Sequence, residues 1–497
     1  MPQSPLPPVP PSLRQLYSVE AWKAQGLATL DRLTAHLESA QTRAASTSFP
    51  AASPEDERQF WETKGAVIND LDRFHHETLV RSNQLHDPRY MGHQVATVLP
   101  ETALTGMVTD VLNNGQAIYE MGPSNAALED LLMNEIGQIM GLPATCGGIL
   151  CHGGTLGNLV ALMAAQRRLA LALGIDSWQD GIGAFPKPLV VLVSKRAHYC
   201  IDRAMRTLGW GAASTLLVET DDQHRMNVRD LHNKLEACHD RGQQVLAIVG
   251  TAGTTSVGSF DPLEDIGKVC ASQGIWFHVD GAHGAAAAFS DKHQALLHGL
   301  NRADSVVMDF HKVCGLPALC TGLFYRKHSD SFLPFSQEAE YLWEHANDQD
   351  WWDTGKRTFE CTKRMLSTRL AAVKAAHGWG IWGELVDRLW DLGSALAHLV
   401  ESRQRWELAT RPQANIVCFR PAPHGEMDTN SWNDVVRSLR KRHLAEGSGY
   451  VVQTEFDGVV WLRCTLMNPL TEEKDLVQML DEFEALLPSV MENMARL

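Results

Sequence analysis

The sequence lacks the features that mark membrane-spanning, secreted and zinc-binding chains. No apolar run approaches the roughly 20 residues that are needed to cross a bilayer. The proline-rich start, MPQSPLPPVPPSLRQL, has neither the basic beginning nor the apolar centre of a signal peptide. The 10 cysteines form no CxxC pair and show no metal-ligand spacing, so we expect reduced thiols and no bound metal. Together these absences predict a cytoplasmic protein.

The chain also has fewer basic residues than acidic ones, 44 against 59. The net charge is −15, which argues against nucleic acid and anionic membranes as partners. The 497 residues are 44% hydrophobic and 21% charged, an ordinary globular balance in a chain long enough for several domains. We predict three parts: a proline-rich arm with a helical segment over 1–100, a large α/β domain over 101–385, and a small α+β domain over 386–497.

Apolar runs and helix signals alternate through the middle of the chain. Near-continuous apolar runs predict strands that are buried on both faces, as in a parallel sheet; they span 189–194, 215–219, 245–251, 275–280 and 305–310. Ser124 and Asp261 are placed like N-cap residues of the helices that follow them. Elsewhere the patterns predict helices over 13–85, 358–400 and 471–494, and strands over 451–467.

Polar residues cluster where these strands end. Lys312 follows the run 305–310, and Asp280 ends the run 275–280. Because ligands bind beyond the carboxyl ends of parallel strands, we expect the two side chains to lie close together. A desolvated lysine attacks aldehydes, and a carboxylate can keep a pyridine nitrogen protonated, so the pair suits pyridoxal chemistry. Taken singly, Lys312 could be a surface residue and Asp280 a turn cap.

Two further segments add to this pair. Gly153, Gly154 and Thr155 open an amphipathic helix, where small residues and free N–H groups favour an anion such as a phosphate. His198 follows another predicted strand. Each signal is weak by itself, because many strand-to-helix turns and strand-end histidines are purely structural. Their occurrence together, in this order, is more specific.

These motifs resemble those of the group II pyridoxal-phosphate-dependent amino acid decarboxylases over about residues 75–470. The resemblance implies an α/β chain with the type I, aspartate-aminotransferase-like fold, pyridoxal 5'-phosphate as cofactor, and a homodimer with its active site between subunits. By resemblance, Lys312 forms the Schiff base, Asp280 binds the pyridine nitrogen, and His198 lies on the ring next to the substrate carboxylate. The other cofactor contacts it implies are Gly153, Gly154, Thr155, Thr255, Ala282, Ser305 and His311.

The sequence departs from the aromatic members of that family at two places. His93 and Gln94 stand where those members carry aromatic residues, which favours a polar substrate side chain; Arg463 is a further candidate for substrate contact. The segment between Phe332 and Arg364 suits a closing lid, yet Thr354 aligns with the tyrosine that is expected to donate a proton. The donor could then be His198 or Tyr341.

We therefore expect α-decarboxylation of a small-molecule L-amino acid, acidic or diamino, to the corresponding amine and carbon dioxide. Two alternatives stay open. One is oxidative decarboxylation and deamination to an aldehyde, which a missing proton donor would favour. The other is a non-catalytic binding relative, which should have lost cofactor residues.

Overall fold

The computed structural model describes residues 9–50, 52–335, 350–423 and 427–494. Its centre is a seven-stranded sheet in the order β1-β7-β6-β5-β4-β2-β3. All strands run parallel except β7, which is antiparallel to both of its neighbours. The strands are β1 (Gly147–Cys151), β2 (Leu189–Ser194), β3 (Thr215–Val218), β4 (Gln244–Thr251), β5 (Trp276–Asp280), β6 (Ser305–Asp309) and β7 (Thr321–Tyr325). The five strands predicted from apolar runs are confirmed.

Helices cover both faces of this sheet, which explains why its strands are apolar at almost every position. Alternate residues of β2 pack into different layers: Val191 and Val193 join a core with α7 and α8, whereas Val190 and Leu192 join one with α9 and α10. The helices of this part are α6 (Pro123–Ile139), α7 (Gly154–Ala172), α8 (Cys200–Thr207), α9 (Val228–Asp240), α10 (Leu263–Gln273) and α11 (Leu366–His377). The predicted α/β architecture is therefore present.

The C-terminal part is a four-stranded antiparallel sheet packed against helices. Its strand order is β10-β11-β9-β8. The elements are α12 (Gly380–Glu401), β8 (Trp406–Leu408), β9 (Ile416–Pro421), α13 (Thr429–Glu446), β10 (Val452–Phe456), β11 (Val459–Thr465) and α14 (Glu473–Met494). The strands predicted over 451–467 and the final helix are confirmed. The single helix predicted over 358–400 is wrong, because Gly378, with φ +71°, ends α11 before α12 begins.

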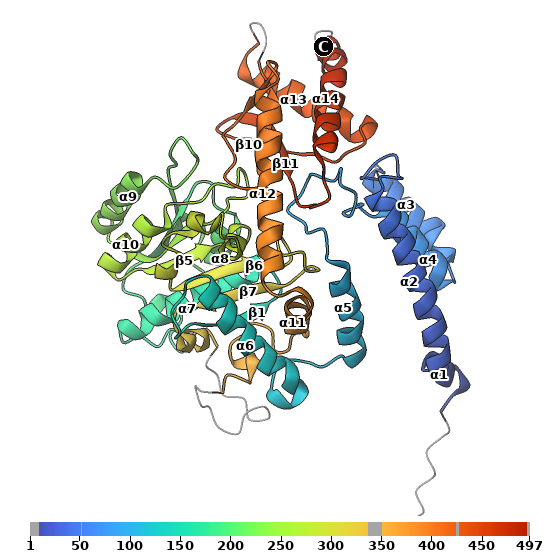
Figure 1. The fold of residues 1–497 in the computed structure, drawn as a ribbon. Helices are drawn as coiled ribbons and strands as arrows, with labels where there is room; N and C mark the ends of the chain where they lie inside the picture. The colour runs from blue at the N-terminus through green and yellow to red at the C-terminus, as the bar shows by residue number, and fades with distance from the viewer. Residues whose placement is uncertain (1–8, 51, 336–349, 424–426, 495–497) are drawn as a thin grey trace, which may run out of the picture.

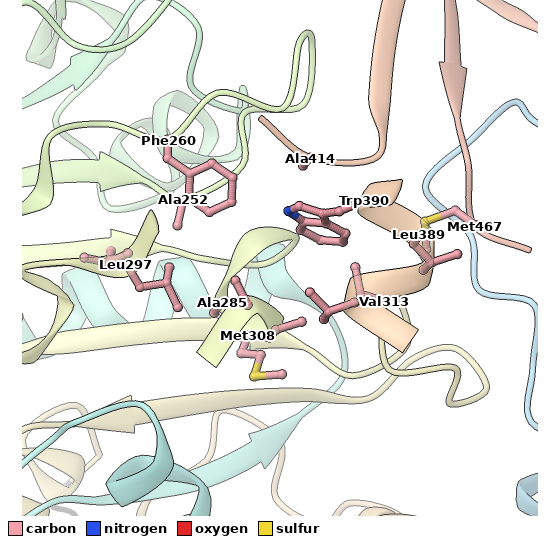
Figure 2. Packing of buried hydrophobic residues seen from close by; sticks show 14 of the residues in the cluster. Ala252, Phe260, Ala285, Leu297, Met308, Val313, Leu389, Trp390, Ala414 and Met467 are labelled. Atoms are coloured by element: carbon pink, nitrogen blue, oxygen red, sulfur yellow. The ribbon is translucent and has the colours of Figure 1, made fainter. Parts of the chain in front are cut away.

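Helix α12 joins the two parts (Figure 1). It runs through residues 385 and 386, so the predicted domain boundary falls inside a helix. One hydrophobic core also spans both sides of that boundary: Trp390 of α12 belongs to the same buried cluster as Phe260, Val313 and Met467 (Figure 2). The division into domains stays a prediction.

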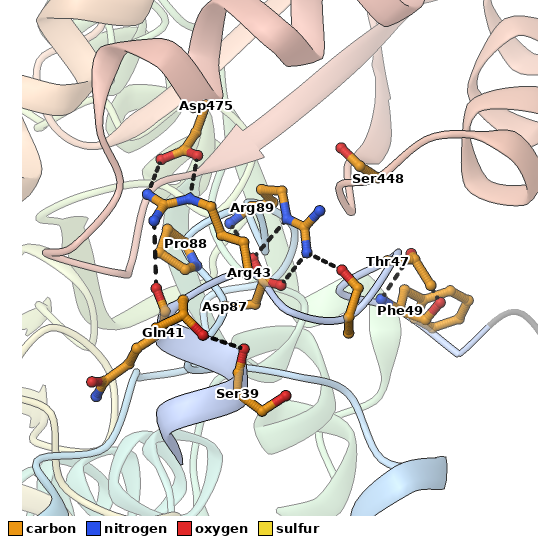
Figure 3. A network of polar contacts seen from close by, with 12 residues as sticks. Ser39, Gln41, Arg43, Thr47, Phe49, Asp87, Pro88, Arg89, Ser448 and Asp475 are labelled. Carbon is orange, nitrogen blue, oxygen red and sulfur yellow. Dashed lines mark hydrogen bonds and ion pairs between the residues drawn. The ribbon is translucent and has the colours of Figure 1, made fainter. Parts of the chain in front are cut away.

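The N-terminal segment lies to one side of the sheet (Figure 1). It holds α1 (Pro11–Leu16), α2 (Val19–Gln41), α3 (Pro54–Thr63), α4 (Leu71–Arg81) and α5 (Pro100–Leu112). Figure 3 shows how the end of α2 is attached: Arg43 donates two hydrogen bonds to Asp475 of α14, at 2.7 and 2.6 Å. Arg89 in turn binds Asp87 and the Ala45 carbonyl, which fixes the chain between α2 and α5.

Two predicted helix caps are wrong. Helix α6 begins at Pro123 with Gly122 as its N-cap, so Ser124 lies inside the first turn. Asp261 caps no helix; its carboxylate accepts backbone N–H groups of Met226 and Thr251, at 2.6 and 2.8 Å. Asp261 thereby ties the end of β4 to the turn before α9. Among the described residues, no helix has both the length and the apolar composition to cross a bilayer.

Candidate active site

A cavity of about 260 Å³ lies at the carboxyl ends of the parallel strands. It brings together nine of the residues predicted from the sequence: Gly153, Gly154, Thr155, His198, Thr255, Asp280, Ala282, His311 and Lys312. These come from the ends of β1, β2, β4, β5 and β6, far apart in the chain. The convergence is that expected of parallel strands, whose carboxyl ends meet at one edge of a sheet.

Lys312 follows β6 and points at a buried carboxylate. Its Nζ lies 3.0 Å from Oδ2 of Asp309, the last residue of that strand. The other carboxylate oxygen of Asp309 accepts a hydrogen bond from the Thr321 hydroxyl at 2.5 Å. Sequence reasoning overlooked Asp309, although it directly precedes Phe310 and the His311-Lys312 pair. The ammonium is thus held at the cavity wall by a neighbouring acid.

Asp280 is the second buried carboxylate of the cavity. It ends β5, and its Oδ1 accepts the backbone N–H of Ala282 at 3.2 Å. Burial raises the pKa of Asp280, and the positive charge of Lys312 acts in the opposite direction. An additional cation at this position would favour the ionised carboxylate.

His198 lies in the loop between β2 and α8. Its Nδ1 accepts the backbone N–H of Cys200 at 3.3 Å, which assigns the ring hydrogen of a neutral imidazole to Nε2. Burial lowers the pKa of His198, with Asp280 opposing that shift. The ring therefore favours the neutral form and leaves Nε2 as a donor.

The glycine turn before α7 forms a cradle for a small anion. Gly153 has φ +107°, a conformation that side chains strongly disfavour. A Cβ at Gly154 would lie 3.0 Å from both carboxylate oxygens of Asp309, so the turn approaches β6 closely. The first N–H groups of a helix have no partner within it, so those of Gly154 and Thr155 are available to a ligand.

Ser305 lies outside this cavity, contrary to its predicted role in phosphate binding. It is the first residue of β6, whereas the cavity adjoins the last. Its hydroxyl accepts a hydrogen bond from Trp276 Nε1 at 2.9 Å and lies 2.8 Å from His278 Nδ1. The opposite nitrogen, His278 Nε2, lies 2.7 Å from Oδ1 of Asn158, which does line the cavity. Ser305 therefore reaches the site only through two other side chains.

The three predicted substrate residues are not part of the cavity lining. His93 Nε2 lies 3.1 Å from the Tyr450 hydroxyl. Arg463 of β11 is 6% exposed, and its Nε and Nη2 have no hydrogen-bond partner among the described residues; the same holds for Gln94 Nε2. The charge of Arg463 helps to lower the pKa values of His93 and of His283, a cavity residue. Arg463 is thus within electrostatic reach of the site.

The end of the predicted lid packs into the protein body. Thr354 is 1% exposed and its hydroxyl donates to the Gln116 carbonyl at 2.8 Å. Arg357 is also buried and donates to the Trp351 carbonyl at 2.7 Å. Thr354 therefore serves a structural hydrogen bond. Tyr341 lies outside the described residues.

One polar contact at the cavity was not foreseen. His152, which precedes the glycine turn, lines the cavity, and its Nδ1 lies 2.9 Å from Glu360 Oε1. The partners are 208 positions apart, so no local pattern could have paired them. Within the described residues, no group of three or more His, Cys, Asp or Glu side chains is arranged to bind a metal ion.

Comparisons with known proteins identify the family of this chain. Residues 56–422 match the pyridoxal-dependent decarboxylase conserved domain. The cysteine sulfinic acid decarboxylase of Mus musculus is 28% identical over 411 residues, covering 80% of this chain and 82% of the relative. The acidic amino acid decarboxylase of Xenopus tropicalis is 28% identical over 409 residues, covering 80% and 79%.

Structural comparison agrees with the sequence match. A crystal structure of mouse CSAD superposes with a TM-score of 0.85 at 24% identity, covering 93% of this chain and 98% of the other. That likeness establishes the predicted type I fold. Because the conserved domain spans most of the chain, the resemblance seen in the motifs is confirmed: this protein belongs to the pyridoxal-dependent decarboxylase family.

Proposed function

We propose that this decarboxylase removes the α-carboxylate of an L-amino acid with a polar, acidic side chain and releases the amine. The observation that carries the reaction type is the convergence of Lys312, Asp280 and His198 on one cavity beside an anion cradle. A non-catalytic relative would not need to keep this set together. The experiment that tests it is a screen of the common L-amino acids for release of carbon dioxide and amine.

The cavity suits pyridoxal 5'-phosphate on grounds of shape and donor chemistry. The cradle of Gly153, Gly154 and Thr155 suits a phosphate, because the first N–H groups of α7 have no partner within the helix and favour an anion. Lys312 supplies the amine for the covalent link, and Asp280 a carboxylate for the pyridine nitrogen. When bound, the cofactor withdraws electrons from the bond that breaks.

The remaining residues shape the environment of that reaction. We assign His198 to the face of the ring, where its Nε2–H can donate to the substrate carboxylate. Ala282 would pack against the ring, Thr255 would contact a cofactor oxygen, and His311 would lie towards the phosphate. Each assignment combines a position on the cavity lining with the family resemblance.

Arg463 supports an acidic substrate. Its guanidinium is buried, and two of its nitrogens have no hydrogen-bond partner among the described residues, so it carries a desolvation cost that a carboxylate or sulfinate would offset. Gln94 Nε2 is a further donor without a partner in that part of the chain. The named activities of the two relatives, on cysteine sulfinic acid and on acidic amino acids, point the same way. Replacement of Arg463 by Lys should raise KM for acidic substrates far more than for apolar ones.

We also propose a cytoplasmic homodimer. Helix α2 leaves large apolar side chains in solvent, among them Trp22 at 59% and Leu27 at 56% exposed, and α5 does so with Val108 at 55% and Val111 at 66%. Exposed apolar surface on these two helices suits burial against a second copy. Light scattering should give twice the chain mass of 55.0 kDa, and Trp22→Glu combined with Val111→Glu should shift it towards monomer.

A second outcome, aldehyde formation, is favoured by the position of Thr354. Its hydroxyl is buried against the Gln116 carbonyl, so it cannot reprotonate a substrate in the cavity. If no other donor acts quickly, oxygen can intercept the reaction. Turnover with and without oxygen, compared between wild type, Tyr341→Phe and His198→Gln, would identify the donor through the ratio of amine to aldehyde.

A further inference from the structure

The pair formed by His152 and Glu360 defines a second imidazole at the cofactor cavity. His152 directly precedes the cradle and shares the cavity lining with it. Glu360 does not line the cavity, and its Oε1 lies 2.9 Å from Nδ1 of His152.

This contact fixes the orientation of the imidazole. A carboxylate only accepts hydrogen bonds, so Nδ1 carries the hydrogen that is shared with Glu360. Burial alone would raise the pKa of Glu360, but the hydrogen bond from His152 and the charge of Lys363 bring it below its ordinary value. The partner of His152 is thus an anion. Among the described residues, Nε2 of His152 has no hydrogen-bond partner and is free for a ligand.

The charges of the cavity call for such a donor. Its described lining contains two carboxylates, Asp280 and Asp309, and one ammonium, that of Lys312, but no arginine. Asp309 lies at the cradle itself, 3.0 Å from the position of a Cβ on Gly154. Because Lys312 forms the covalent link, it does not serve as counter-charge for a phosphate dianion. Another cation is needed near the cradle.

The other cavity imidazoles are less suited to this task. Burial lowers the pKa of His283 to about 3, and its Nε2 lies 2.7 Å from Asn415 Oδ1. His311 Nδ1 is already occupied by the backbone of Cys320, at 2.9 Å. Burial also lowers the pKa of His198. His311 also lies near a carboxylate, that of Asp309 at 3.8 Å, but Asp309 itself lines the cavity. Among the described residues, His152 is the one cavity imidazole that is paired with a carboxylate from outside the lining.

Building on the proposed function, we propose that His152, oriented by Glu360, binds the phosphate group of the cofactor through Nε2. Donation from Nε2 requires the doubly protonated ring, in which both hydrogen bonds are charge-assisted. His152 thereby acts as a specificity residue for phosphorylated over unphosphorylated pyridoxal, and Glu360 as its positioning residue.

Binding of pyridoxal phosphate and of pyridoxal to the apoenzyme tests this assignment without reference to turnover. His152→Ala should weaken binding of pyridoxal phosphate about tenfold, as expected for one charge-assisted hydrogen bond. Pyridoxal lacks the phosphate and so cannot make this hydrogen bond; its binding should change by less than about twofold. Glu360→Gln should give a smaller loss of the same kind, and none when His152 is already replaced.

The matched control is His377→Ala. His377 also pairs with a glutamate, Glu101, at 2.6 Å, but it does not line the cavity. The His377→Ala variant should bind pyridoxal phosphate and pyridoxal as the wild type does. Equal losses for the two ligands, no loss for either, or the same pattern in the control would overturn the proposal. If His152→Ala does not fold, His152→Gln keeps a neutral donor of similar size and should still lose phosphate selectivity.

Discussion

Polar side chains lie at both ends of β5 and β6, but they differ in residue type and in charge. At the amino end, Trp276, His278 and Ser305 bond to one another, and burial lowers the pKa of His278 to about 3, so the ring is neutral. At the carboxyl end, Asp280, Asp309 and Lys312 gather two negative charges and one positive charge in a cavity. Both ends are buried, so burial does not distinguish them. We expect the ligand-binding site at the carboxyl end, where charged side chains lie close together and part of their hydrogen-bonding capacity is unused.

Replacement of Lys312 should have the largest effect at the carboxyl end. Lys312→Ala removes the amine of the covalent link, so activity should be lost together with the visible absorbance band of the holoenzyme. Borohydride should trap the cofactor on the peptide containing Lys312 in wild type. The surface variant Lys292→Ala serves as control, and label on any other lysine would contradict the assignment.

Asp280→Asn should come next. A neutral amide cannot hold the proton of the pyridine nitrogen, so turnover should fall by several orders of magnitude while the fold persists. Rates should be measured at saturating cofactor, with circular dichroism as the check on folding. A variant within tenfold of wild type would rule out the proposed role.

His198→Ala should lower turnover more than cofactor content. The proposed donor to the substrate carboxylate is lost, whereas the phosphate and the covalent link keep the cofactor in place. The two quantities are measured on one preparation, by absorbance and by carbon dioxide release. Equal losses would identify a structural histidine, since an unpartnered buried group costs about 1–3 kcal/mol by itself.

Ser305→Ala should have the smallest effect on function and sharpens the contrast between the two ends. It leaves Trp276 Nε1 and His278 Nδ1 without their partner, so the free energy of unfolding should fall by about 1–3 kcal/mol. Affinity for pyridoxal phosphate should be unchanged. Thr155→Ala, in the cradle, should instead weaken the binding of pyridoxal phosphate and leave the free energy of unfolding unchanged. If Ser305→Ala keeps its stability but binds the cofactor weakly, then Ser305 contacts the phosphate after all, in spite of its position at the far end of β6.

The sequence was informative where burial imposes a simple pattern. The runs 189–194 and 305–310 predicted strands because helices cover both faces of the sheet. Strands β1 and β7 were not predicted, since glycine in each of them shortens the apolar run. The helix caps at Ser124 and Asp261 failed because capping depends on backbone geometry, which residue type alone does not determine.

The candidate site was predictable where it depends on strand ends and unpredictable where it depends on tertiary contacts. Lys312 was singled out because it follows an apolar run and Asp280 because it ends one, and both line the same cavity. The phosphate contact of Ser305 was implied by the family resemblance alone, and Ser305 begins β6 at the end away from the cavity. The partnership of His152 with Glu360 joins segments that meet only after folding.

The single antiparallel strand β7 separates two strands that serve the same site. It lies between β1, which leads into the cradle, and β6, which leads to Lys312. Neighbouring strands are about 4.8 Å apart, so β1 and β6 lie roughly 10 Å from each other across the sheet. The turn after β1 closes that interval, because a Cβ at Gly154 would lie 3.0 Å from Asp309, the residue that also pairs with Lys312 Nζ at 3.0 Å. Two strands that are not neighbours in the sheet thus deliver their end residues to opposite sides of one small ligand.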